Sequence, residues 1–169
     1  MASALTDLAP HFFQVAYVVP NLEEAEAWFG RTFGVSYFER MEGVAMGEGC
    51  RHRGGPSDGV LDISLGFFGV TQVELVKPAG GTSIHSEFQD AGGTGLHHIA
   101  FVVPDFAATT ARLTGELGEP AADGVIAGGM RVDFAYYECN SAAASTIEIL
   151  GFDAAARDFM TELKQKSRR

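Results

Sequence analysis

The chain carries the same short pattern twice, and this repeat constrains the fold more than any other feature. Residues 13–22 and 95–106 each contain a polar residue, an apolar run, a proline, and then an asparagine or aspartate. Gln14 and His98 hold equivalent positions, 98 − 14 = 84 residues apart, about half of the 169-residue chain. A repeat of this kind indicates the duplication of one small module.

Each copy of the pattern predicts a strand followed by a helix. In the first copy the apolar run ends at Pro20, which cannot donate to a sheet, and Asn21 is a favourable N-cap. Apolar residues at helical spacing follow, and runs that alternate between apolar and polar residues predict further strands. The expected strands are 12–19, 35–38, 60–68, 71–76, 96–103, 124–126, 131–138 and 146–150, and the expected helices are 22–33, 106–117 and 153–166.

The predicted fold class is α+β, with tandem βαβββ modules that form a curved mixed-sheet cup. We expect the first module at residues 11–78, a linker with one helical turn at 79–95, the second module at 96–152, and a helix and tail at 153–169. The Gly-rich stretch 41–59 reads as a loop. The last helix is expected to cover an edge or a dimer seam. The two modules can pair within one chain or swap between chains, and a homodimer is expected.

Composition excludes several classes of protein. The formal net charge of −10 argues against a nucleic-acid partner, because such proteins need a basic surface to displace counterions. No apolar run approaches the ~20 residues that span a bilayer, so no membrane partner is expected. Cys50 and Cys139 are the only cysteines, neither lies in a CxxC pair, and no signal peptide precedes them. These features predict a cytoplasmic protein without a disulfide.

Polar residues on the strands point to a candidate site. Alternation places Gln14 and His98 on the face of each first strand that turns away from the module's own helix. The same alternation places Glu74 and Glu148 on that face of each fourth strand. Each residue alone is most simply a solvent-facing or edge side chain. Together they place four polar residues on the concave face, two from each module.

This set of side chains suits one divalent metal ion. A carboxylate between apolar strand neighbours is costly to bury unless it is paired or bound to metal, and two carboxylates balance a 2+ charge. One nitrogen and three oxygen ligands favour Zn, Ni, Co, Mn or Fe in an open site over a structural tetrahedral site. The predicted metal ligands are therefore Gln14, Glu74, His98 and Glu148. Phe12, Ala16, Ala100, Phe134 and Tyr136 are expected to shape the cavity.

The remaining histidines and the basic cluster are assigned other positions. His97 is expected to support the site as a neighbour of His98, because its side chain points to the other face. His11, His52 and His85 are expected at the surface. The stretch 51–53, Arg-His-Arg, reads as a solvated loop that could instead meet a phosphate or carboxylate.

The paired strand–proline motifs, with Val-Glu-Leu-Val at 73–76 and Ile-Glu-Ile-Leu at 147–150, resemble the vicinal oxygen chelate superfamily over residues 11–152. This superfamily includes glyoxalase I, methylmalonyl-CoA epimerase, extradiol dioxygenases and bleomycin-resistance proteins. The linker and the start of the second module look most like methylmalonyl-CoA epimerase. The residues that carry this likeness are 75–78, 83–88 and 95–101. The resemblance implies the same four metal ligands. The set Gln, Glu, His, Glu looks like glyoxalase I of the eukaryotic type.

The leading functional hypothesis is a metal-dependent isomerase or lyase, epimerase-like or glyoxalase I-like, that moves a proton next to a carbonyl through a metal-chelated enediolate. Glu148 is the candidate base, with Glu74 or Asp62 as a second proton carrier and Asp62 placed on the concave face. One alternative is a metal-free protein that binds a small molecule and confers resistance. An extradiol-type dioxygenase ranks lower, because it needs two histidines and one carboxylate, and only His98 is suitably placed.

Overall fold

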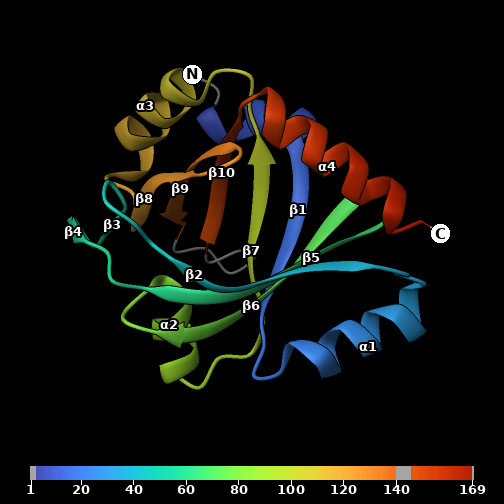
Figure 1. Cartoon of the computed structure of the whole chain (residues 1–169). Helices are drawn as coiled ribbons and strands as arrows, with labels where there is room; N and C mark the ends of the chain where they lie inside the picture. Colours follow the sequence, from blue (N-terminus) through green and yellow to red (C-terminus); the bar gives the residue numbers. More distant parts are fainter. Residues whose placement is uncertain (1–2, 140–145, 169) are drawn as a thin grey trace.

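The computed structural model describes residues 3–139 and 146–168, which form one strongly curved sheet with helices against it (Figure 1). The ten strands lie in the order β2-β5-β6-β1-β7-β10-β9-β8-β3-β4. They are β1 (Phe12–Val18), β2 (Phe38–Ala45), β3 (Arg51–His52), β4 (Gly55–Pro56), β5 (Val60–Phe68), β6 (Thr71–Gly80), β7 (Gly95–Val102), β8 (Ala122–Ala127), β9 (Arg131–Glu138) and β10 (Thr146–Phe152).

The helices follow the predicted order. They are the 3-10 helix η1 (Ala4–His11), α1 (Leu22–Phe33), α2 (Ile84–Asp90), α3 (Phe106–Leu117) and α4 (Ala154–Lys166). The side chains of Asn21, Asp105 and Asp153 each accept a hydrogen bond from the backbone N–H three residues ahead, so each of the long helices begins at an N-cap readable in the sequence. Gly34 ends α1 at a φ of 70°, where a glycine carries no Cβ penalty.

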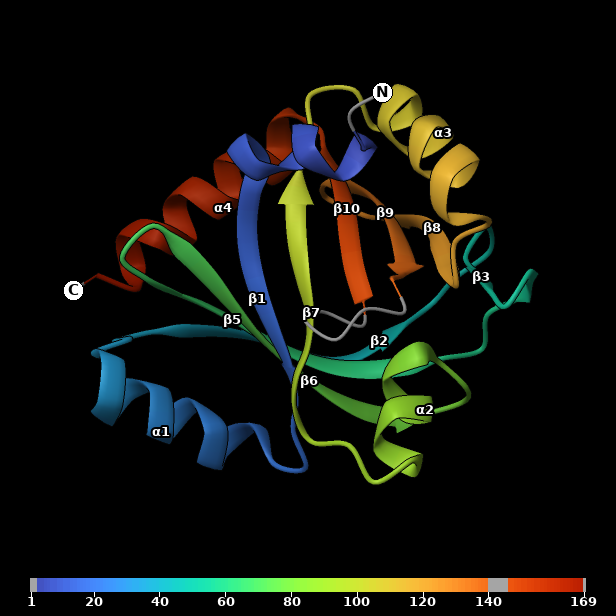
Figure 2. The same cartoon turned by 180° about the vertical axis from the view of Figure 1, so that it is seen from behind.

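The two halves of the sheet meet at β1 and β7, which pair antiparallel at its centre. On either side, β6 pairs parallel with β1 and β10 pairs parallel with β7, so each half repeats the same arrangement. The predicted α+β cup of tandem modules is confirmed, and both halves of the cup come from one chain (Figure 2).

Helices α1 and α3 cover the convex face of the sheet. Phe29 of α1 packs with Val73 and Leu75 of β6, and Leu113 of α3 packs with Phe101 and Ile149 of β7 and β10. Fully burying a leucine such as Leu113 stabilises the fold by roughly 1.5–3 kcal/mol. The apolar strand faces predicted to meet the helices are therefore the convex ones, and the opposite face is left to line the cup.

Helix α4 closes part of the cup. Phe159, Met160 and Leu163 pack against β5, and Met160 reaches the cavity inside the sheet. The last helix thus covers one wall of the cavity, where the sequence predicted an edge or a dimer seam.

Three local predictions are wrong. The second strand is not 35–38 but begins at Phe38 and runs to Ala45, and the stretch 41–59 contains the end of β2 together with β3 and β4. Strand β2 is a half-exposed edge strand with a bulge between Met41 and Val44, which explains its weak alternation. Strand β6 extends to Gly80, so it enters the predicted linker. The linker helix was predicted and is found as α2.

The predicted units 96–152 and 153–169 include residues 140–145 and 169, which lie outside the described residues. Cys50 and Cys139 are free thiols. Within the described residues, no helix combines the length and the apolar character needed to cross a bilayer.

Candidate metal centre

The four predicted site residues converge on the concave face at the central seam, where β1 and β7 pair. Strand register aligns Glu74, Ala16 and His98 in one row across β6, β1 and β7. A second row holds Gln14, Ala100 and Glu148 across β1, β7 and β10. Side chains of directly opposite residues lie on the same face of a sheet, so both rows face the cup.

Small residues at the centre of each row let the polar side chains meet. Ala16 and Ala100 are both fully buried. The ligand atoms of Glu74, His98 and Glu148 all lie within 4.8 Å of one another. His98 Nε2 lies 3.2 Å from a Glu148 oxygen and 3.4 Å from a Glu74 oxygen. The structure therefore brings together a compact group of one imidazole and two carboxylates.

Gln14 is held with its oxygen free. Its Nε2 donates to Oε1 of Gln72 over 2.7 Å, and Gln72 Nε2 lies 3.0 Å from the sulfur of Met160 on α4. Gln14 Oε1 is buried and has no hydrogen-bond partner among the described residues. This chain of contacts fixes which end of the Gln14 amide is available to a ligand.

The electrostatics of the cluster favour a positive charge at its centre. Burial by itself lowers the pKa of His98, but the carboxylates of Glu148 and Glu74 outweigh burial and raise that pKa to about 9. Burial, aided by the charge of Glu148, raises the pKa of Glu74. Burial, and then the nearby carboxylates, also raise the pKa of Tyr136 well above its usual value, so this phenol stays protonated.

The donor set fits a divalent cation. Glu74 Oε2 and His98 Nε2 are buried without a hydrogen-bond partner among the described residues, as is Gln14 Oε1. Leaving buried polar atoms unpaired is costly, and a cation is a partner that carboxylate oxygens, amide oxygens and imidazole nitrogens can all bind. Three oxygens and one nitrogen suit Zn²⁺, Ni²⁺, Co²⁺, Mn²⁺ or Fe²⁺.

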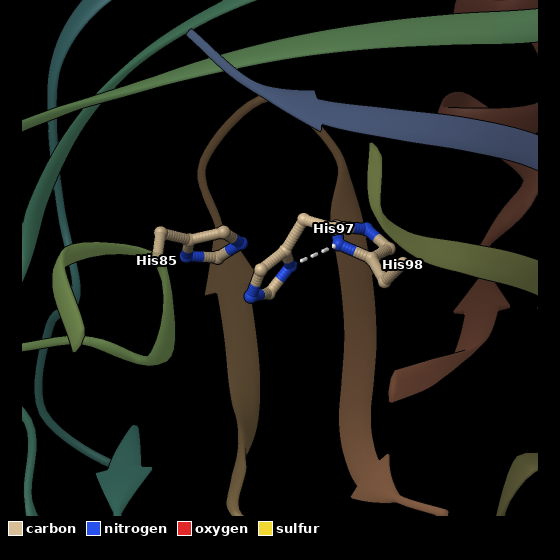
Figure 3. A group of neighbouring side chains, drawn as sticks. All are labelled: His85, His97 and His98. Atoms are coloured by element: carbon tan, nitrogen blue, oxygen red, sulfur yellow. Dashed lines mark hydrogen bonds between the residues drawn. The ribbon is translucent and has the colours of Figure 1, made fainter. Parts of the chain in front are cut away.

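Two more histidines lie beside the cluster (Figure 3). His97 Nδ1 and His98 Nδ1 are 2.9 Å apart. Burial, and then the charge of His98, lower the pKa of His97 to about 4, so its ring is neutral at pH 7. His97 therefore contacts His98 as predicted, but the prediction that its side chain points to the other face is wrong. The strand register shifts at this point, and the His97 ring lies beside the rings of His98 and His85.

The prediction that His85 lies at the surface is wrong. Its side chain is almost fully buried, and its ring faces Tyr136 across 5.5 Å between centroids. His85 lies on α2, and the path of the linker brings this helix against the cup. His52, the middle residue of the stretch 51–53, is only partly exposed and also lines the cavity.

A cavity of about 130 Å³ opens in front of the cluster. Its wall is mostly apolar, with methionines from β2, from the segment after β2, from the segment before β9 and from α4. Phe134 and Tyr136 line it as expected, whereas Phe12 is half exposed on the outside and packs on Phe101. The main apolar lining residues are Met41, Met46, Leu61, Ile63, Leu65, Met130, Val132, Phe134, Leu150, Phe152 and Met160.

The predicted place of Asp62 on the concave face is wrong. Strand β5 pairs with β6 so that Leu65 lies opposite Glu74, which turns Leu61, Ile63 and Leu65 toward the cavity and Asp62 away from it. Asp62 accepts hydrogen bonds from the Gly43 backbone over 2.9 Å and from Lys77 Nζ over 3.1 Å. These contacts lower its pKa and leave it remote from the cluster.

The sequence alone missed several polar residues of the cavity, among them Gln72 and His85. Gln72 follows the same alternation as Glu74, so the strand pattern could have identified it. His85 gave no such signal, because its position depends on how α2 packs against the sheet.

Comparison with known proteins places this geometry in a family. The Glyoxalase/Bleomycin resistance protein/Dioxygenase superfamily is the family whose model matches, over residues 13–136. The chain belongs to this superfamily. The match to the glyoxalase superfamily includes Gln14, Glu74 and His98 and ends before Glu148. A search of curated proteins found no match.

Solved structures share the glyoxalase superfamily fold at low sequence identity. Methylmalonyl-CoA epimerase from Mycobacterium tuberculosis is 18% identical with a TM-score of 0.57, covering 85% of this chain and 89% of that one. A Streptomyces coelicolor methylmalonyl-CoA epimerase variant in complex with 2-nitronate-propionyl-CoA is 17% identical with a TM-score of 0.59, covering 86% and 96%. A protein from Bacillus halodurans C-125 is 16% identical with a TM-score of 0.55, covering 83% and 92%. These similarities establish the fold alone.

Proposed function

We propose that this protein is a metal-dependent isomerase or lyase that transfers a proton next to a carbonyl group. The observation that carries the proposal is the largely buried group of Glu74, His98 and Glu148 at the wall of an apolar cavity. Among the described residues, Glu74 Oε2 and His98 Nε2 of this group have no hydrogen-bond partner. A divalent cation held by these residues and Gln14 would act as a Lewis acid toward the oxygens of a bound carbonyl compound. Membership of the glyoxalase superfamily and the likeness to epimerases support this reaction class.

Different side chains of the site have different proposed roles in such a reaction. Glu148 is the proposed base, because a carboxylate of the ligand group that leaves or shares the metal could take a proton from the carbon next to the carbonyl. Glu74 faces Glu148 across His98 and is the proposed second proton carrier. The apolar wall excludes water and strengthens the electrostatic interactions inside. Asp62 is not proposed for proton transfer, because it faces away from the cavity.

The test of the proposed function is a substrate screen with purified protein loaded with Ni²⁺, Co²⁺ or Zn²⁺. Methylmalonyl-CoA, glutathione hemithioacetals and small α-hydroxy ketones represent the epimerase and glyoxalase reaction classes. Proton transfer at carbon is read as the uptake of solvent deuterium, which reports exchange even without net conversion. A metal-loaded protein that exchanges no carbon-bound proton in any of these compounds would contradict the proposal.

The alternative is a metal-free small-molecule binding protein, and the largely apolar cavity is the observation in its favour. Metal content separates the two functions. An extradiol-type dioxygenase is not favoured, because Glu74, His98 and Glu148 offer one histidine and two carboxylates. The homodimer and the cytoplasmic location stay predictions.

His97 is proposed to position the metal ligand His98. Its 2.9 Å contact with Nδ1 of His98 directs the other nitrogen, Nε2, toward the carboxylates. We expect His97→Phe to weaken metal affinity about 10–100-fold, the usual range for losing a partner of a ligating histidine. A competition titration with a chromophoric chelator measures this affinity. His11→Phe is the control, and equal affinity in both variants would contradict the role of His97.

A further inference from the structure

His85 is placed in the cavity wall by the start of helix α2. The side chain of Ser83 accepts from the backbone of Ser86, and the side chain of Ser86 accepts from the backbone of Ser83, so a capping box fixes this end of the helix. His85 is the second residue of the helix, and its side chain is 3% exposed. It lines the same cavity as Glu74 and Glu148.

Both ring nitrogens of His85 are buried without a hydrogen-bond partner among the described residues. Its neighbours are three rings, at distances between centroids of 4.8 Å for His97, 5.5 Å for Tyr136 and 5.8 Å for His98. Figure 3 shows the rings of His97 and His98 beside that of His85. Packing against these rings accounts for the burial of its carbon atoms but not of its nitrogens. A buried donor and acceptor without partners cost free energy that a bound polar group would recover.

The rest of the wall limits the charge of that bound group. Arg51 is the only lysine or arginine that lines the cavity within the described residues, and it is paired with Asp123 over 2.6 Å. The protein carries a net charge of −10. An anionic group inside the cavity would therefore lack a free positive side chain, whereas an uncharged oxygen needs only a hydrogen bond.

We propose that His85 is a second polar binding point of the cavity, which hydrogen-bonds a hydroxyl or carbonyl oxygen of the ligand. The inference rests on the proposed function and names its substrate class. The substrate is a small, uncharged, mainly apolar molecule with an adjacent pair of oxygens at the carboxylate–histidine cluster and a further oxygen at His85. A neutral imidazole offers one donor and one acceptor, so it can bind either kind of oxygen.

The test uses Co²⁺-loaded protein and four probes: benzohydroxamate, which offers an adjacent oxygen pair, and its 2-, 3- and 4-hydroxy derivatives. Affinities are measured by calorimetry and by the Co²⁺ absorption spectrum. We expect at least one hydroxy derivative to bind the wild-type protein about tenfold more tightly than benzohydroxamate, as one hydrogen bond predicts. We expect His85→Phe to bring the ratio of hydroxy-derivative affinity to benzohydroxamate affinity down to about one, and His85→Gln to keep part of the tenfold ratio.

The outcomes separate this inference from the function on which it rests. A protein that binds no Co²⁺ overturns both. The second outcome is a protein that binds Co²⁺ and benzohydroxamate, with the same affinity for the hydroxy derivatives in the wild type and in His85→Phe. This outcome overturns only the role of His85, whose nitrogens then bind water. Equal Co²⁺ stoichiometry and thermal midpoint in the variants show that they are folded and loaded.

Discussion

Glu148→Gln is expected to lower turnover about 10²–10⁴-fold, the usual contribution of a general base. The substitution keeps the shape of the side chain and an oxygen that can ligate metal, but it removes the proton acceptor. Glu148 is buried next to His98, so no solvent base can easily replace it. The measurement is the rate of deuterium uptake by the substrate found in the screen, with metal content determined on the same sample.

The matched control for Glu148→Gln is Asp62→Asn. It makes the same chemical change on the opposite face of the sheet, where the carboxylate pairs with Lys77. We expect the turnover of this variant to stay within about twofold of wild type, because Asp62 lies outside the cavity and does not touch the cluster. Wild-type turnover in Glu148→Gln would remove Glu148 as the base.

The double variant Glu74→Ala/Glu148→Ala is expected to lose the bound metal, from near one divalent ion per chain to near none. It removes both negative charges of the cluster, and of the four predicted ligands only the imidazole of His98 and the amide of Gln14 remain. A bound ion at 100 times its dissociation constant stabilises a protein by about 2.7 kcal/mol, so Zn²⁺ should raise the thermal midpoint of the wild type and not that of the variant. Mass spectrometry of the metal and a melting curve measure the two effects.

The control for this prediction is Glu42→Ala/Glu48→Ala, which removes the same charge from exposed positions. It should bind metal as the wild type does. A wild-type protein that stays metal-free in the presence of Ni²⁺, Co²⁺ and Zn²⁺ would exclude the metal-dependent function and leave the small-molecule binding protein.

Duplication and strand alternation together made much of the candidate site predictable. The position of Gln14 in the first copy fixes that of His98 in the second, and the period of two fixes the face on which each side chain lies. The strand register then brings them together with Glu74 and Glu148 as expected. This part of the prediction needed only the alternation within each strand and the constant spacing between the two copies of the repeat.

The wrong predictions concern residues whose surroundings depend on tertiary packing and not on the neighbouring sequence. Asp62 was misplaced because the cavity wall is as apolar as the core. The sequence therefore does not show whether the apolar face of β5 lines the cavity or packs in the core, nor which way Asp62 on the other face points. His85 was misplaced because a linker sequence does not show which surface its helix meets. Strand β2 was missed because an edge strand with a bulge and half-exposed residues lacks clear alternation.

The two rows at the central seam have a consequence for stereochemistry. One row joins Glu74 to an imidazole across Ala16, and the other joins Glu148 to an amide across Ala100. The backbone keeps the symmetry of the duplication, but the side chains at positions 14 and 98 break it. A flat compound in the cavity in front of the rows would therefore meet different chemical groups from the two modules, which gives the centre a built-in handedness.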